Sequence, residues 1–241
     1  MFLSAAYYRH PAFRQGALDS LSAAPGLAAW GLMTGVTMMN AGMSLSESLL
    51  MSVLVFAGSS QLAAIPLLVS GAPMWVILAT GACVNLRFVV FSAHLRPYMM
   101  HLPLWQRLVT GYLMADLSYV LFVKRYPQPG QTPAQRLEQH AYVAGNCGVN
   151  WVSWVFCSVL GVALANFIPT RWGLGFAGTL ALLGILCSLL SSRLRLIATG
   201  VAGTAAVAAF AVPFKLNILL AIAATVAFCL LVENTFDRKP T

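Results

Sequence analysis

The sequence predicts an all-α fold, a polytopic membrane bundle of about seven to eight transmembrane segments with broken or re-entrant helices. Of the 241 residues, 59% are hydrophobic and 8% are charged, whereas soluble domains carry about 25% charged residues. Apolar runs of about 20 residues, enough to cross a hydrocarbon core about 30 Å thick, recur along the chain. Residues 1–241 are therefore expected to form one integral membrane domain in a lipid bilayer.

Charge and motif content exclude several classes of function. The net charge is +8, but the basic residues lie mostly between apolar runs, where they act as topology signals, and they form no aromatic and basic patch for nucleic acid. The five cysteines have no CxxC spacing, so we expect no metal site. The sequence has no GxSxG, HExxH or Walker motif, so we expect neither an enzyme nor a cofactor.

The first half carries the clearest helix interruptions. Pro25 and Gly26 predict a kinked or unwound entry to the first span. Gly58–Gln61 and Pro66 weaken the second span, which we predict to be broken or re-entrant near Gly58–Gln61. Ser44 and Glu47 form a capping-box pattern at its start. The first three predicted spans cover residues 23–41, 47–69 and 74–95. Only residues 70–73 separate the second span from the third, so these two form a tight hairpin unless one of them is re-entrant.

A polar connection at residues 124–140 divides the chain into halves of about 1–123 and 141–241. Trp30, Gly35 and Asn40 in the first half resemble Trp154, Gly161 and Asn166 in the second half. This similarity reflects either an internal repeat or chance in a sequence rich in Gly and Ala. The further predicted spans cover residues 108–123, 141–167, 173–190 and, as two spans broken around Pro213 and Lys215, 196–231.

Basic residues predict the orientation of the bundle. With eight crossings and both termini inside, nine basic residues lie in the cytoplasm and four outside. If the second span is re-entrant, seven crossings remain and Arg96 and Arg107 change sides. The nine are Arg9, Arg14, Lys124, Arg125, Arg136, Arg193, Arg195, Arg238 and Lys239, and the four are Arg96, Arg107, Arg171 and Lys215.

Arg87 is the first candidate for a functional residue. A guanidinium near mid-membrane costs about 2.5 kcal/mol or more, so it normally faces a bundle interior or an aqueous cavity. It either binds a substrate carboxylate or pairs with Asp116 as a structural element. Asn85 lies two residues earlier, which on an undistorted helix places the two side chains about 200° apart. Asn85 is a further candidate for substrate binding.

Gly58, Ser59, Ser60 and Gln61 form the second group of candidates. Freed backbone N–H groups at the start of a half-helix can bind an anionic group such as a carboxylate. Alternatively, these small residues permit close helix packing, and Gln61 makes a hydrogen bond across the interface.

Asp116 is the only acidic residue well inside a predicted span. It is a candidate for binding an ammonium group or for proton coupling, because burial favours the protonated form of a carboxyl group. The alternative is an ion pair with Arg87 that only holds two helices together. Asn150, with Asn146 and Ser153, lines the cavity or makes hydrogen bonds between helices, and we include Asn150 among the substrate-binding candidates.

Several motifs together resemble the AzlC-type family, the large subunits of bacterial branched-chain amino acid exporters. They are the Ser-x-x-Glu entry at residues 44–47, FAGSSQLAA, VNLRFVVFSAHLRP, LMAD and WVSWVFCSVLG, in order between Gln15 and Gly161. One departure is Ala115, where the family often has Thr before the acidic residue.

The resemblance implies export of Leu, Ile, Val or methionine across the bacterial cytoplasmic membrane, together with a small membrane subunit of the AzlD type. We expect a secondary transporter with the zwitterion held between a positive and a negative pole. A channel or pore for a small solute is the alternative. A purely structural scaffold would not need Arg87 and Asp116 inside the bundle.

Overall fold

The computed structural model describes residues 5–167, 193–210 and 216–236, and every regular element in these ranges is a helix. The predicted all-α class is confirmed for this part of the chain. Two helices, α5 (Met74–Met99) and α8 (Pro133–Leu164), are long and apolar enough to cross a membrane. The predicted sixth span, residues 173–190, lies outside the described residues, and the number of spans stays a prediction.

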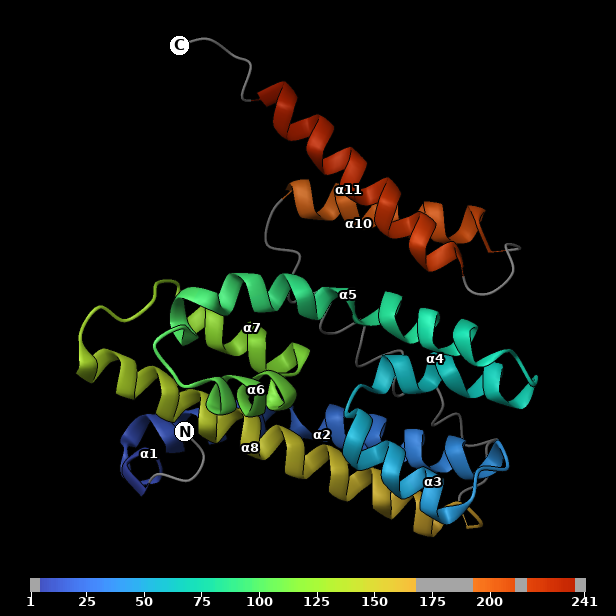
Figure 1. The fold of residues 1–241 in the computed structure, drawn as a ribbon, viewed down its shortest axis with the longest axis horizontal. Coiled ribbons are helices and arrows are strands. Elements are labelled where there is room, and N and C mark those ends of the chain that lie inside the picture. Colours follow the sequence, from blue (N-terminus) through green and yellow to red (C-terminus); the bar gives the residue numbers. More distant parts are fainter. Residues whose placement is uncertain (1–4, 168–192, 211–215, 237–241) are drawn as a thin grey trace.

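Two long helices form what we call the spine of the bundle (Figure 1). α2 (Pro11–Asn40) follows the short α1 (Ala5–Arg9) and lies against α8, which runs in the same direction. α2 is helical through Pro25, so the entry at Pro25 and Gly26 is not unwound, and the alternative prediction of a kink stays a prediction. A proline removes only one backbone donor, and the buried contacts with α8 stabilise the helix on both sides of it.

Glycines let the two spine helices touch backbone to backbone. A Cβ at Gly35 would overlap the carbonyl oxygen of Ser158, and one at Gly161 would overlap that of Leu32. Gly35 follows Leu32 by three residues, as Gly161 follows Ser158, so the contact is reciprocal. Small residues at a crossing permit the closest helix approach in membranes. This reciprocal packing agrees with an internal repeat, which the sequence offered as one of two alternatives and which stays a hypothesis.

α8 begins earlier than the sequence predicts. Thr132 and Gln135 form a capping box, so the helix starts at Pro133 and not at Ala141. The preceding helix, α7, ends at Arg125. The polar connection predicted at residues 124–140 is therefore a loop of residues 126–132 between two helix ends.

The first hairpin replaces the predicted second span. It consists of α3 (Leu45–Leu50), a π-helical turn at Met51–Val55 and α4 (Gly58–Val69). The chain reverses at Phe56 and Ala57, where Phe56 has a left-handed φ of 40°, a conformation that costs about 1–2 kcal/mol for an L-residue. Figure 1 shows both helices in the half of the bundle where α2 ends, with α4 next to α5 and α3 next to α8.

This reversal confirms that the second span is broken near Gly58–Gln61, and it corrects the position of the break. The four residues are not unwound, because they form the first turn of α4. The helix also continues through Pro66. At the other end of the hairpin, Ser44 and Glu47 make the predicted capping box, with Glu47 Oε2 2.8 Å from the Ser44 nitrogen.

α5 returns along the whole bundle, and a second hairpin enters from its far end. This second hairpin consists of α6 (Leu104–Leu113) and α7 (Asp116–Arg125), joined by extended residues Met114 and Ala115. The prediction of one continuous span over residues 108–123 is therefore wrong. Asp116 does not lie in the interior of a helix, because it is the first residue of α7.

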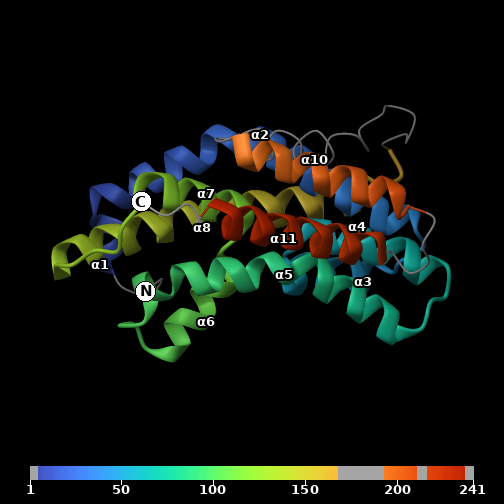
Figure 2. The same cartoon turned by 90° about the horizontal axis from the view of Figure 1, so that it is seen from above.

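The two hairpins point toward each other from opposite ends of the bundle. α4 runs from the middle of the bundle toward the start of α5, whereas α7 runs from the middle toward the end of α5 (Figures 1 and 2). The ring contacts of α7 with α5 follow this direction. Tyr119 stacks on Phe91 with ring centroids 3.9 Å apart, and Phe122 packs against Tyr98 at 5.2 Å. Tyr98 is thus buried in the bundle.

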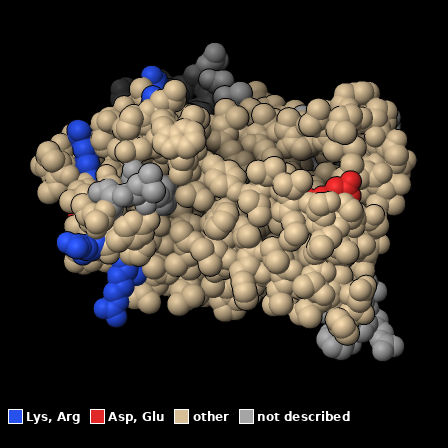
Figure 3. All heavy atoms as spheres, turned by 60° about the horizontal axis from the view of Figure 1, so that its bottom comes forward, with Lys and Arg blue, Asp and Glu red and all other residues tan. Residues whose placement is uncertain are grey.

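Basic side chains collect at the end of the bundle that holds the second hairpin. The start of α2, the end of α5, both ends of the second hairpin and the start of α8 all lie there, and Figure 3 shows Lys and Arg at this end of the face in view. By contrast, residues 15–86, which include the first hairpin, contain no Lys or Arg. The basic residues at the end that holds the second hairpin are Arg9, Arg14, Arg96, Arg107, Lys124, Arg125 and Arg136.

α10 (Arg193–Ala208) and α11 (Leu216–Phe236) form a further helix pair, and α11 contacts α5. The sequence predicted two helices over residues 196–231, and two are found. The predicted break around Pro213 and Lys215 falls at residues 211–215, outside the described residues.

Candidate functional site

The tips of the two hairpins meet in the middle of the bundle. The hydroxyl of Tyr112 at the end of α6 donates a hydrogen bond to the carbonyl oxygen of Val53, and its ring lies 5.9 Å from that of Phe56. Trp151 of α8 donates its indole N–H to the same hydroxyl at 3.0 Å. Both helix breaks therefore lie at one level, fixed against the spine.

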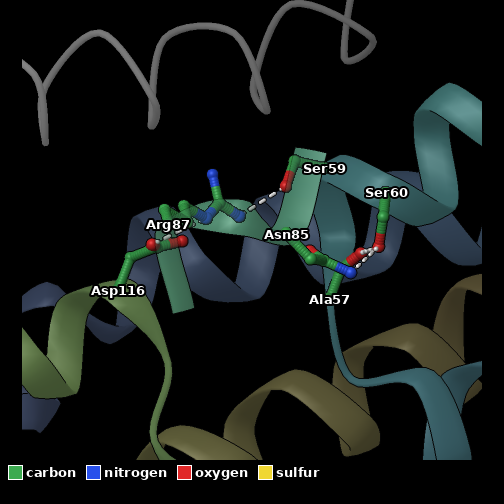
Figure 4. Close-up of polar contacts among 6 residues, drawn as sticks. All are labelled: Ala57, Ser59, Ser60, Asn85, Arg87 and Asp116. Atoms are coloured by element: carbon green, nitrogen blue, oxygen red, sulfur yellow. Dashed lines mark hydrogen bonds and ion pairs between the residues drawn. The ribbon is translucent and has the colours of Figure 1, made fainter. Parts of the chain in front are cut away.

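Arg87 connects the two tips. It lies near the midpoint of α5, and its side chain extends between the hairpins (Figure 4). Nη2 donates a hydrogen bond of 2.5 Å to Ser59 Oγ of α4. Nε lies 3.0 Å from Asp116 Oδ1 of α7. One guanidinium thus contacts the first turn of two helices that run in opposite directions.

The contact between Arg87 and Asp116 is an ion pair without the alignment of a hydrogen bond, because Arg87 Nε has no hydrogen-bond acceptor among the described residues. The two side chains remain 30% and 20% exposed. The sequence allowed this pairing as one of two alternatives, and the geometry confirms the contact. A misaligned and accessible pair leaves both groups able to bind a further charged group.

Asn85 supports the same region from the side. Its amide nitrogen lies 3.3 Å from Ser60 Oγ, and Ser60 donates to the carbonyl oxygen of Ala57 at 2.9 Å (Figure 4). Asn85 does not line the pocket that Arg87 lines, as expected for two residues about 200° apart on a helix. It holds the first turn of α4 in place.

Helix dipoles make this region electropositive. α4 and α7 both begin beside Arg87, and a helix N-terminus carries about half a positive charge. Asp116 is the one carboxylate that contacts Arg87 among the described residues. The positive charge of the guanidinium and of two helix starts therefore exceeds the negative charge of Asp116, which favours a further anion.

A small pocket lies beside this pair. Its volume is about 40 Å³, room for about three water molecules at 10–15 Å³ of accessible volume each. A cavity that binds benzene measures about 150 Å³, so the pocket is closed to a leucine side chain in this conformation. It is lined by Leu27, Trp30, Phe56, Ala57, Gly58, Arg87, Phe88, Ala115, Asp116, Leu117, Asn150 and Trp154.

Polar groups in the pocket wall have no partner among the described residues. Asn150 is 1% exposed, and neither its amide oxygen nor its amide nitrogen makes a hydrogen bond. The indole nitrogens of Trp30 and Trp154 are also buried without a partner. Leaving a buried polar group unsatisfied costs about 1–3 kcal/mol, so these groups indicate a site for a polar ligand or water.

The structure brings half of the predicted site residues to the pocket. Gly58, Arg87, Asp116 and Asn150 line it. Ser59, Ser60, Gln61 and Asn85 lie behind it, where Gln61 donates to the Met51 carbonyl oxygen at 3.1 Å. Asn146, by contrast, donates to the Ser118 carbonyl oxygen at 3.1 Å and so joins α8 to α7.

The predicted site residues included none of the four aromatic residues that line the pocket, Trp30, Phe56, Phe88 and Trp154. Apolar side chains in an apolar helix carry no signal of their own. The similarity of the segments around Trp30 and Trp154 was the available signal, because these two indoles contact each other with ring centroids 5.4 Å apart. Within the described residues, no group of three His, Cys, Asp or Glu side chains could hold a metal ion.

Comparison with known families gives one match. The family model described as AzlC protein matches residues 22–168, which include both hairpins, α5 and the pocket. Searches of curated proteins and of solved structures find no match.

Proposed function

The chain belongs to the AzlC family, and from this premise we propose that it is a secondary transporter that exports branched-chain or other neutral apolar amino acids. The family is associated with membrane transport of amino acids and works with a partner subunit. The Arg87–Asp116 pair, placed where two helix breaks meet, is the observation that carries the proposal for this chain.

We place the protein as a multi-pass protein in the bacterial inner membrane. α5 and α8 cross the bilayer in this proposal. α2 crosses with α8, because it packs along α8 in the same direction, and the two hairpins enter from opposite faces without crossing. The basic end then lies in the cytoplasm, because cytoplasmic loops carry the excess of Lys and Arg. This orientation assigns Arg96 and Arg107 to the cytoplasm, on the same side as Arg9 and Arg14.

The carboxylate of the amino acid binds on the side of the first hairpin. Arg87 supplies a guanidinium, and the start of α4 supplies backbone N–H groups and a positive dipole end. The unpartnered indole N–H groups of Trp30 and Trp154 are further donors beside it. Hydrogen bonds from these donors to a carboxylate are charge-assisted and about twice as strong as hydrogen bonds between neutral groups.

The ammonium group binds on the side of the second hairpin. Asp116 supplies negative charge, and the unpartnered amide oxygen of Asn150 supplies an acceptor. The apolar side chain packs against Leu27, Phe56 and Phe88 when the pocket is enlarged. Since the closed pocket holds only a few waters, substrate entry requires the hairpin tips to separate.

Asp116 couples transport to protons in this proposal. When substrate or a conformational change withdraws Arg87, the carboxyl group is left in an apolar bundle, where its neutral form is favoured. Proton uptake by Asp116 from one side and release to the other would then accompany each transport cycle.

A small subunit of the AzlD type completes the transporter. α10 presents a small-residue surface suited to close helix contact. Gly200 and Gly203 have open space where a Cβ would lie, and Val207 is 76% exposed. If the chain alone, reconstituted without a partner, exported leucine as fast as the co-expressed pair, the partner would be excluded from the proposal.

Counterflow of labelled leucine in proteoliposomes tests the function. The expected result is exchange of internal for external leucine without a gradient, and net export that responds to a proton gradient. Arg87→Met should reduce exchange to the level of empty liposomes. Flux that rises linearly with leucine and shows no exchange would instead indicate a channel.

A further inference from the structure

A second cavity lies between α5 and α6, outside the site already described. It is an open groove of about 870 Å³, within the size range of small-molecule sites. Most of its wall is apolar and includes Phe91, Leu95, Leu104 and Leu108. Because Leu104 and Leu108 are exposed, no other described element covers the groove.

Two arginines stand at one end of this groove. Arg96 comes from the last turns of α5, and Arg107 comes from α6. Neither forms an ion pair within the described part of the chain. Among the described residues, Arg107 Nε is buried without a hydrogen-bond partner, and Arg107 Nη1 has only the Met100 sulfur at 3.2 Å, a weak acceptor. No described residue therefore supplies an anion at this end of the groove.

The length of the groove matches one leaflet of a bilayer. Along α5 it extends from Phe88, at mid-length, to Met100, which is about 18 Å at 1.5 Å per residue. Half of a hydrocarbon core about 30 Å thick is about 15 Å. A partner helix would need a groove along the full thickness, whereas one acyl chain needs one leaflet.

We propose that this groove binds an anionic glycerophospholipid, with an acyl chain along α5 and α6 and the phosphate between Arg96 and Arg107. Basic pockets between helices on the cytoplasmic side are suited to anionic headgroups. Exposed Trp105 beside the groove fits the headgroup level. This inference uses the membrane placement proposed above but not the identity of the transported solute.

Native mass spectrometry of the purified full chain tests the proposal, with phosphatidylglycerol and phosphatidylcholine of identical acyl chains as probes. Phosphatidylglycerol is expected to bind at least about tenfold more tightly. The double variant R96Q/R107Q should lose this preference. The matched control R9Q/R14Q removes the same charge at the same end of the bundle, away from the groove, and should keep it.

A second variant separates a lipid from a free phosphate. Leu108→Trp fills the groove and leaves both arginines in place, so it should weaken phosphatidylglycerol binding, and inorganic phosphate should not displace the lipid. Equal binding of both lipids, an equal loss in the R9Q/R14Q control, displacement by phosphate or unchanged binding to Leu108→Trp would each overturn the proposal. Loss of a co-expressed partner from R96Q/R107Q would overturn it in favour of a protein interface.

Discussion

The two hairpins reach the same level from opposite ends of the bundle, yet they bring different chemistry to it. The first brings neutral groups, the Ser59 hydroxyl and the N–H groups of α4. The second brings a carboxylate, Asp116, at the start of α7. Arg87 contacts both. The difference indicates that the first hairpin is suited to an anion and the second to a cation.

The largest expected effect comes from breaking the connection between the hairpins. Arg87→Met should reduce leucine counterflow to background, whereas Asp116→Asn should either weaken ammonium binding or abolish proton coupling while counterflow survives. Each single change leaves one charge without its partner, which costs about 3–5 kcal/mol for a buried pair, and less here because both groups are partly exposed. Transport by purified variants at matched membrane abundance measures the effect.

The double variant Arg87→Met/Asp116→Asn separates function from structure. With both charges removed, folding should recover, because no unpaired charge remains. If the pair holds the two poles of the substrate, the double variant folds and does not transport. Wild-type counterflow by the double variant would show that the pair is only structural.

A smaller but still large effect is expected at the tip of the first hairpin. A methyl group at Gly58 would overlap the indole of Trp154, and overpacking of this kind costs about 1–3 kcal/mol. Gly58→Ala should therefore lower thermal stability in detergent and reduce counterflow. Gly111→Ala on the second hairpin is the matched control, since a Cβ there meets open space and should stabilise α6 by about 0.5–1 kcal/mol. Equal melting temperatures for the two variants would contradict this contrast.

Removal of one hydroxyl tests the anionic role of the first hairpin. Ser59→Ala deletes the hydrogen bond to Arg87, worth about 1.5–3 kcal/mol when one partner is charged. The half-saturating leucine concentration should rise several-fold while protein abundance stays unchanged. The Ser60 hydroxyl contacts Asn85 and not Arg87. Ser60→Ala should therefore change the half-saturating leucine concentration less than Ser59→Ala does. A larger effect of Ser60→Ala would move the carboxylate site away from Arg87.

The smallest effect is expected at the entry of the first hairpin. Ser44→Ala removes the cap of α3 and should cost about 1 kcal/mol of stability, read from a denaturant titration in detergent. Counterflow should not change, because Ser44 lies far from the tip. α6 begins after Pro103 without a side-chain cap, so Pro103→Ala should not show this loss. If Ser44→Ala folds normally and still transports less leucine, the entry of the first hairpin affects the tip, and this prediction is contradicted.

The first break could be predicted from the sequence and the second could not. Gly58, Ser59 and Ser60 are poor helix formers, so a weak point near them is expected. Met114 and Ala115 are good helix formers, and the break there comes from tertiary contacts such as that of Tyr112 with Val53. The remaining signal was Asp116 itself, because an acidic residue often marks the first turn of a helix.

The same contrast applies to the pocket. Arg87 and Asp116 were predictable because charges inside an apolar bundle need a partner or a function. The small size of the pocket and its aromatic wall were not predictable, since Trp30 and Phe88 resemble any other lipid-facing or core residue in sequence. Only the meeting of the two hairpin tips gives them a position.

The contact between Gly58 and Trp154 has a consequence for biosynthesis. α4 has 12 residues, fewer than the about 20 that a helix needs to span a bilayer by itself. Its packing partner on α8 is made roughly 100 residues later, about 5–20 s at normal elongation rates. The earliest polar segment of the site therefore waits in a nascent chain until Trp154 has entered the membrane. A ribosome stalled before the codon for Trp154 would leave the tip of the first hairpin without the indole against which Gly58 packs.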